Sequence, residues 1–285
     1  MKVRQIGRRR KIHRVFTMEQ VLITACLFFL SAAVLIICIV RNNSEGRIRM
    51  GKKIWITAHR GASYGAPENT KAAIELAIAE QADYAEIDVR LTKDGIPVLM
   101  HDRALFRTTG IANKIDQLTY AELLSYDAGR KYAEEFAGEV VPCLQEILEV
   151  YGDQIKFNIE LKGGNDRTLA GTVITLIEKY GLEEQCVVSS AFYEQLEWVK
   201  KENKKIRTGY ILPLVYGEVF GYDAADFFSV RSDSVTEQLV RGAHAKGKEI
   251  HAWTVNKSYE IKRMREVGVD NIITDKPAYV RELLR

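Results

Sequence analysis

The stretch IWITAHRGASYGAPENTKAAIELAIAEQADYAEIDVRL, residues 54–91, contains one complete folding unit. A short apolar run at 54–58 is followed by a polar loop, an amphipathic segment near 68–80 and a second β-rich run at 84–91. A strand, a helix and a second strand in this order are typical of a parallel β-α-β unit. The stretch therefore predicts a parallel sheet covered by helices.

The same alternation continues to the end of the chain, each run being followed by a turn or a helical pattern. Further β-rich runs lie at 96–100, 155–161, 186–190, 206–212, 226–230, 249–253 and 271–274, and helices are expected near 119–125 and 166–180. About eight parallel strands favour a closed (β/α)8 TIM barrel over an open doubly wound sheet. An open sheet would usually place a glycine-rich loop after its first strand, and none follows Ala58. Residues 92–95 predict a tight turn and 102–141 an irregular insertion.

The segment before the barrel divides into three parts. A basic leader covers 1–20, an apolar run without a charged side chain covers 21–40, and a polar tether covers 41–53. As a helix, 20 residues span about 30 Å, the thickness of the hydrocarbon core of a bilayer. We interpret 21–40 as a single transmembrane helix, because the run is longer than the apolar part of a signal peptide and lacks a small-residue cleavage site. Lipid attachment at Cys38 is the remaining alternative, disfavoured by the preceding isoleucines.

Charge is distributed unevenly along the chain. Of 41 basic and 38 acidic residues, 12 basic and two acidic residues lie in 1–53, which leaves 29 basic against 36 acidic residues in 54–285. The barrel is therefore mildly acidic, and we expect no nucleic-acid partner. Seven basic residues precede the apolar run and five shortly follow it, so the leader is expected to stay in the cytoplasm and the barrel to be extracytoplasmic. Cys143 and Cys186 are expected to be buried free thiols, with a disulfide as the alternative.

Charged residues follow or end several of the predicted strands. His59 and Arg60 follow the first, Glu86 and Asp88 lie two apart within the second, His101 follows the run at 96–100, and Glu160 and Lys162 close the run at 155–161. Side chains two apart on a strand project to the same side. In a β/α barrel the reactive groups gather at the carboxyl ends of the strands, so these groups are expected to converge there.

Three converging carboxylates indicate a site for a hard divalent cation. Their oxygen atoms suit Mg²⁺ or Ca²⁺, and zinc is the weaker choice because only two histidines and no cysteine accompany them. Two imidazoles beside a cation are what phosphodiester cleavage requires, one to accept a proton and one to donate it. Some of these residues also have purely structural interpretations. Glu160 and Lys162 could form a simple ion pair, and Glu68 could stabilise the first turn of the helix near 68–80. Trp253 either packs in the barrel or forms a wall of the substrate pocket.

Residues 59–102 resemble the opening signature of the glycerophosphodiester phosphodiesterase family, in the order H-R-G, P-E-N-T, E-x-D-V, T-x-D-G and H-D. The resemblance continues through 159–162, 252–256 and 273–277 and covers nearly all of 54–285. The departures are mild, since Asn271 stands where the family often has glycine and Ala191 separates Ser190 from Phe192.

The resemblance implies a barrel that hydrolyses glycerophosphodiesters to glycerol 3-phosphate and an alcohol with Ca²⁺ or Mg²⁺. It implies metal ligands at Glu86, Asp88 and Glu160, with Glu68 beside them, an acid/base pair at His59 and His101, and substrate contacts at Arg60, Lys162 and Asn69. It also implies attack by a neighbouring glycerol hydroxyl, which gives a cyclic phosphate that water opens. Two alternatives remain: a phospholipid or an envelope glycerol-phosphate polymer as substrate, and a catalytically silent barrel that binds a phosphorylated ligand. The oligomeric state is left open.

Overall fold

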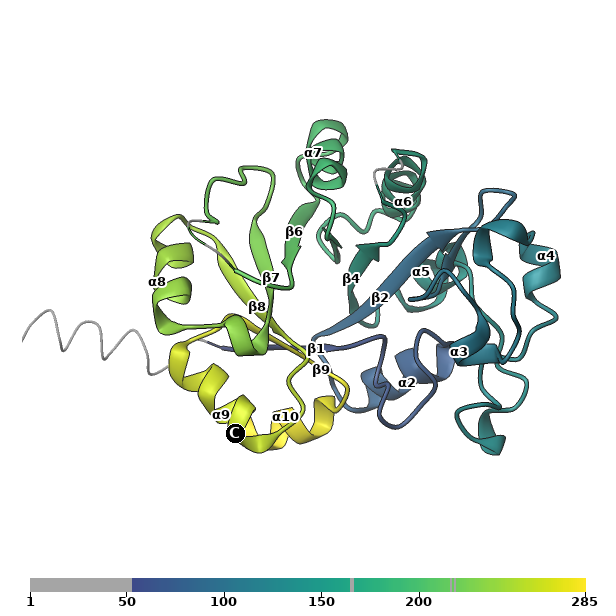
Figure 1. The fold of residues 1–285 in the computed structure, drawn as a ribbon, viewed down its shortest axis with the longest axis horizontal. Helices are drawn as coiled ribbons and strands as arrows, with labels where there is room; N and C mark the ends of the chain where they lie inside the picture. Colours follow the sequence, from purple (N-terminus) through teal and green to yellow (C-terminus); the bar gives the residue numbers. More distant parts are fainter. Residues whose placement is uncertain (1–52, 165–166, 216, 218) are drawn as a thin grey trace, which may run out of the picture. The chain divides into compact units, whose positions relative to one another are not determined.

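The run at 54–58 is the first of eight parallel strands that close into a barrel. The computed structural model describes residues 53–164, 167–215, 217 and 219–285. Helices surround the strands (Figure 1). The parallel strands are β1 (Trp55–Ala58), β2 (Tyr84–Leu91), β4 (Lys156–Leu161), β5 (Cys186–Ser190), β6 (Arg207–Leu212), β7 (Phe227–Arg231), β8 (Glu249–Trp253) and β9 (Asn271–Thr274).

The barrel closes because β1 pairs on both of its edges. Thr57 lies opposite Tyr84 of β2 and opposite Ile273 of β9, and both pairings are parallel. The remaining neighbours follow in the order β9, β8, β7, β6, β5, β4, β2. Closure leaves no parallel strand with an unpaired edge, and the apolar residues that alternate along each strand fill the interior or meet the helices. The predicted TIM barrel is confirmed.

One predicted strand does not belong to the barrel wall. The run at 96–100 forms β3 (Pro97–Leu99), which runs antiparallel to β2 and pairs with no other described strand, although an isolated bridge joins Val98 to Cys143. The turn predicted at 92–95 joins the two, with Gly95 at φ 78°. The insertion that follows contains α3 (Phe106–Thr109), η1 (Ile115–Gln117), α4 (Tyr120–Leu123) and η2 (Glu134–Phe136). A capping box on Thr119 begins α4, as the pattern near 119–125 predicted.

Seven longer helices cover the barrel from outside. They are α2 (Lys71–Ala79), α5 (Leu144–Tyr151), α6 (Arg167–Tyr180), α7 (Tyr193–Glu202), α8 (Glu237–Ala245), α9 (Ser258–Val267) and α10 (Pro277–Leu284). Thr70 caps α2 by accepting a hydrogen bond from the amide of Ala73. The helical pattern expected after the run at 206–212 is wrong, because the described residues between β6 and β7 form no helix.

The core is built from side chains of the strands and the inner faces of the helices. Ile87, Phe157 and Ile159 are fully buried on β2 and β4. The interior is tight at β6, where a Cβ on Gly209 would lie 2.0 Å from the ring of Phe227. Cys143 and Cys186 are free thiols, so the alternative of a disulfide is wrong.

The membrane prediction concerns residues that the structure does not describe. Residues 1–52, with the leader, the apolar run and nearly all of the tether, lie outside the described ranges. Within the described ranges, no helix combines the length and the apolar character needed to cross a bilayer.

Candidate active site

Three acids meet at the mouth of the barrel, the end at which the parallel strands finish. Asp88 of β2 lies directly opposite Glu160 of β4, and Glu86 stands two residues before Asp88 on the same side of the strand. One carboxylate oxygen from each acid lies within 4.8 Å of the other two. The strand register therefore brings together the three residues that the sequence predicted as metal ligands.

Polar neighbours hold these acids in place. The backbone amide of Arg60 donates to Glu86 Oε2 at 2.8 Å. Asn69 is buried and makes two hydrogen bonds to Asp88, donating from Nδ2 to Oδ2 at 2.9 Å and accepting from the backbone amide at 3.0 Å. Lys162 Nζ lies 2.6 Å from Glu160 Oε1 and 3.1 Å from Asp88 Oδ1. Asn69, predicted to contact substrate, is thus committed to orienting Asp88.

Burial and mutual repulsion make this cluster electrostatically costly. Burial raises the pKa of Glu86 to about 8, and the neighbouring charge of Asp88 adds to the effect. Burial also opposes ionisation of Asp88, but Lys162 and Arg60 outweigh it and lower the pKa of that carboxyl to about 2. Burial and Asp88 raise the pKa of Glu160. An added cation would stabilise all three acids in the charged form.

The donor set fits a divalent cation. Within the described part of the chain, Asp88 Oδ1 is buried and accepts no hydrogen bond, although the Lys162 ammonium lies near it. A buried acceptor without a donor is unfavourable, and a metal ion is one way to satisfy it. Three carboxylates supply the hard oxygen ligands that Mg²⁺ and Ca²⁺ prefer. Glu86, Asp88 and Glu160 are therefore the residues that would hold such an ion.

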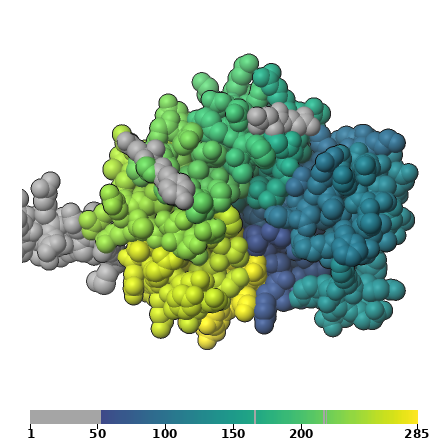
Figure 2. Space-filling model, in the orientation of Figure 1, coloured from purple at the N-terminus to yellow at the C-terminus, as the bar shows by residue number. Residues whose placement is uncertain are grey.

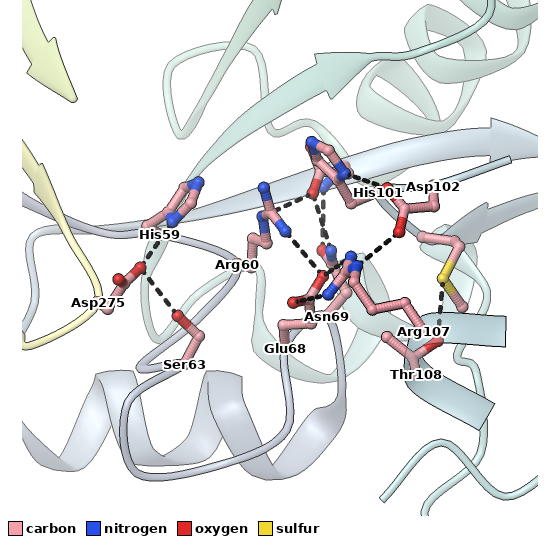
Figure 3. Close-up of polar contacts among 12 residues, drawn as sticks. His59, Arg60, Ser63, Glu68, Asn69, His101, Asp102, Arg107, Thr108 and Asp275 are labelled. Atoms are coloured by element: carbon pink, nitrogen blue, oxygen red, sulfur yellow. Dashed lines mark hydrogen bonds and ion pairs between the residues drawn. The ribbon is translucent and has the colours of Figure 1, made fainter. Parts of the chain in front are cut away.

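His59 follows β1 and is oriented by a carboxylate from the far end of the chain. Its Nδ1 lies 2.7 Å from Oδ1 of Asp275, which follows β9 (Figure 3). Asp275 in turn accepts hydrogen bonds from Asn256 Nδ2 at 2.6 Å and Ser63 Oγ at 3.1 Å. Burial disfavours the imidazolium, but Asp275 and then Glu86 outweigh it, so the pKa of His59 is raised. Asp275 thus fixes the orientation of the His59 ring through Nδ1.

His101 has a similar partner but an opposite electrostatic balance. Its Nδ1 lies 2.7 Å from Oδ1 of the adjacent Asp102, and Arg107 Nε donates to Asp102 Oδ2 at 2.6 Å. Burial lowers the pKa of His101, and the positive charges of Lys162 and Arg60 lower it further, against the opposing effect of Asp88. The pKa values of the two imidazoles are thus shifted in opposite directions.

Glu68 lies between two arginines rather than among the three acids. Arg60 Nη1 donates to Glu68 Oε1 at 2.9 Å, and Arg107 binds both carboxylate oxygens, at 2.5 and 2.7 Å (Figure 3). Burial opposes ionisation of Glu68, but Arg107 and Arg60 together lower its pKa. A direct role for Glu68 as a metal ligand stays a prediction.

Trp253 closes β8 at the same end of the barrel and is half-buried. Among the described residues its Nε1–H finds no acceptor, although the atom is buried. Phe192, after β5, is exposed over 42% of its surface. The role of Trp253 as a wall of the substrate pocket stays a prediction.

Three residues of the site lie in motifs that the sequence offers but were assigned no role from it. Asp275 and Asp102 each orient a histidine, and Arg107 joins Asp102 to Glu68. A carboxylate directly after β9 was the available signal for Asp275, since β9 closes the barrel beside β1. Arg107 lies in the irregular insertion, where no strand pattern indicates where a side chain will point.

A sequence profile of the glycerophosphoryl diester phosphodiesterase family matches residues 59–180 and 188–279. These ranges contain all of the acids, histidines and basic residues described above. The chain is 35% identical over 243 residues to a glycerophosphodiester phosphodiesterase of Caldanaerobacter subterraneus subsp. tengcongensis, covering 82% of this chain and 98% of the relative. It is 28% identical over 268 residues to a lysophospholipase D of Homo sapiens, covering 80% of this chain and 85% of the relative.

A solved structure gives the same result at the level of the fold. A phosphodiesterase of Oleispira antarctica, in complex with the product sn-glycerol-3-phosphate, superimposes with a TM-score of 0.77 at 28% identity. The match covers 81% of this chain and 96% of that chain. That relative therefore consists almost entirely of a barrel of this kind.

Proposed function

Because the chain belongs to the glycerophosphoryl diester phosphodiesterase family and is a phosphoric diester hydrolase, we propose that it hydrolyses glycerophosphodiesters to glycerol 3-phosphate and an alcohol. The observation that carries this proposal is the meeting of Glu86, Asp88 and Glu160 at one barrel mouth. The product complex of the Oleispira antarctica relative supports glycerol 3-phosphate as the product.

The two histidines divide the proton transfers. His101, whose pKa is lowered, is the general base that removes the proton from the attacking glycerol hydroxyl. His59, whose pKa is raised, is the general acid that protonates the departing alkoxide as its bond to phosphorus breaks. The product of this step is a cyclic phosphate. Water opens it with the roles reversed, so that each histidine recovers its starting state.

Arg60 and Lys162 offset the charge that develops on the phosphoryl oxygens. Both lie beside the acid cluster, with Arg60 Nε 3.4 Å and Lys162 Nζ 3.1 Å from Asp88. A bound Ca²⁺ or Mg²⁺ would supply Lewis-acid stabilisation of the same oxygens. Positioned positive charge in a buried site stabilises such a transition state more than it would in water.

A lysophospholipid is the second candidate substrate. It carries the same glycerophosphodiester group, and the human relative is a lysophospholipase D. An envelope glycerol-phosphate polymer shares this chemistry too. A silent binding barrel is disfavoured because His59, His101 and all three acids are present in one site.

The sequence before the barrel supports a membrane location for this activity. The 20-residue apolar run at 21–40 and the basic leader before it favour a single-pass anchor with an extracytoplasmic barrel. Protease protection of the barrel in sealed spheroplasts and inverted vesicles would test this orientation. Accessibility only in inverted vesicles would contradict it.

Histidine variants test the proposed chemistry. His59→Ala and His101→Ala should each lower turnover of glycerophosphocholine by about 10²-fold or more. His244→Ala is the matched control, because this histidine also pairs with a carboxylate, Asp270 at 2.8 Å, on α8 away from the mouth. Full activity in His59→Ala or His101→Ala would contradict the proposed acid and base roles of these histidines.

A separate assay ranks the candidate substrates. It compares turnover of glycerophosphocholine, lysophosphatidylcholine and the glycerol-phosphate polymer by the unaltered protein.

A further inference from the structure

Exposed aromatic side chains gather around the barrel mouth. Among the described residues, Tyr64 follows β1 and is 67% exposed, while Phe106 and Tyr132, in the insertion, are 60% and 45% exposed. Figure 2 shows the teal insertion next to the dark blue segment after β1, which adjoins the yellow C-terminal segment. Exposed aromatic groups that cluster in this way usually mark a binding surface.

Two lysines and one hydrogen bond accompany these rings. Lys131 Nζ lies 4.6 Å from the centre of the Phe106 ring and donates to the carbonyl oxygen of Phe106 at 2.6 Å. Tyr132 Oη donates to the carbonyl oxygen of Tyr64 at 2.5 Å, and Lys276 Nζ lies 3.8 Å from the centre of the Tyr64 ring. We call Tyr64, Phe106, Lys131, Tyr132 and Lys276 the rim strip.

The rim strip differs from its surroundings in charge. No ion pair within the described ranges involves Lys131 or Lys276, whereas Arg103 pairs with Asp116 and Arg107 with Glu68 and Asp102. Residues 54–285 carry 29 basic against 36 acidic residues, so lysines without an ion pair add positive charge to an acidic segment. The Lys179–Tyr180 and Lys201–Trp198 pairs differ, since their rings are half-buried, whereas Lys257 lies 5.8 Å from the exposed ring of Tyr259.

The rim strip borders the catalytic residues. The backbone amide of Tyr64 donates to the carbonyl oxygen of Asp275, the partner of His59, at 3.1 Å. Phe106 precedes Arg107, which holds Asp102. A surface bound by the rim strip would therefore lie next to the site where the diester is cleaved.

We propose that the rim strip binds the surface of a bilayer that contains anionic phospholipid. Tyrosine and phenylalanine rings enter the region between headgroups and acyl chains, and the lysines meet the lipid phosphates. Uncompensated positive charge beside exposed rings complements such a surface. The apolar run at 21–40 is long enough to span a bilayer, which favours lipid over a protein partner.

The test uses residues 53–285, which form one closed unit with their own core. The match to the Oleispira antarctica relative covers 96% of that chain, so we expect the segment to fold alone. Co-sedimentation of residues 53–285 with phosphatidylcholine vesicles, with or without phosphatidylglycerol, is measured at low ionic strength. We expect binding to the vesicles that contain phosphatidylglycerol and little binding to the others.

Matched variants separate the rim strip from general charge. Lys131→Glu with Lys276→Glu should weaken binding by at least about tenfold, since each lysine near an anionic surface contributes about fivefold. Lys179→Glu with Lys201→Glu makes the same change in charge beside the rings of Tyr180 and Trp198, outside the rim strip. This control pair should weaken binding by less than about twofold. Tyr64→Ser with Phe106→Ser should also weaken it.

Three outcomes would overturn the proposal. They are no binding of the unaltered segment to vesicles with phosphatidylglycerol, equal weakening by both lysine pairs, and full binding by the variants of the rim strip. Thermal unfolding confirms that each variant is folded, and Lys131→Gln with Lys276→Gln replaces the glutamate pair if that pair is not. Because vesicle binding is read without turnover, its failure would leave the hydrolase activity unaffected.

Discussion

The hydrogen bond between His59 and Asp275 gives a prediction about pH. Asp275→Asn removes the negative charge that lies 2.7 Å from His59 Nδ1 and retains a side chain of the same shape. Burial already disfavours the imidazolium, and Asp275 is the main group that raises the pKa of His59 against it. The substitution should therefore lower that pKa.

The size of the shift follows from the strength of the bond. A hydrogen bond to a charged group contributes about 1.5–3 kcal/mol, and one pKa unit corresponds to about 1.36 kcal/mol. The asparagine retains a neutral bond of about half that strength, so about 0.75–1.5 kcal/mol is lost and the expected shift is roughly 0.5–1 pH unit. As the general acid, His59 is active when protonated, so activity is lost as pH rises through its pKa. The alkaline limb of the kcat/KM profile should move to lower pH by that amount.

The other histidine supplies the control. Asp102→Asn removes the negative charge from the bond that raises the pKa of His101, so that pKa should fall further. As the general base, His101 is active when neutral, and the acid limb should move to lower pH while the alkaline limb stays in place. The assay is release of glycerol phosphate from glycerophosphocholine across the pH range. An unmoved alkaline limb in Asp275→Asn, or a moved acid limb in its place, would refute the assignment.

Three further predictions concern the mouth and the core. Arg107→Met should lower kcat/KM by about tenfold, because it releases Asp102. The free energy of urea unfolding should fall by less than about 1 kcal/mol, since Arg107 is half-exposed. An unchanged kcat/KM would count against the positioning role of Arg107. Phe157→Ala should lower the free energy of unfolding by about 3–5 kcal/mol, because the ring is fully buried, and a loss below about 1 kcal/mol would contradict the packing. Gly209→Ala should destabilise by at least about 1 kcal/mol in the same urea titration, because its methyl group meets the Phe227 ring; unaltered stability would show that the ring moves freely.

Most of the barrel could be predicted from the sequence because parallel strands, buried on both faces, read as separate apolar runs. The direction of β3 was not evident from the strand itself, since three apolar residues look alike in a parallel and an antiparallel strand. The predicted turn at 92–95 indicated it, because a short turn can join only antiparallel strands. The strand pattern did not predict that the described residues between β6 and β7 form no helix, because this pattern indicates strands and not the segments that connect them.

The core of the site was predictable for a different reason. Glu86, Asp88 and Glu160 stand on strands whose register follows once the barrel is assumed. The partners of the histidines depend on contacts between distant segments, as for His59 and Asp275, which are 216 residues apart. The position of Asn69 in the family motif predicted a contact with substrate. In the structure its buried side-chain amide donates a hydrogen bond to Asp88.

The most direct test of the account is the dependence of activity on a divalent cation. Protein stripped with chelator is assayed for glycerol phosphate release from glycerophosphocholine as Ca²⁺ or Mg²⁺ is added back, alongside Glu86→Gln. We predict no turnover without the ion, recovery with it, and a half-maximal ion concentration raised at least about tenfold in the variant. Full turnover by the stripped protein, or the same ion dependence in Glu86→Gln, would contradict the claim that the three acids share one cation.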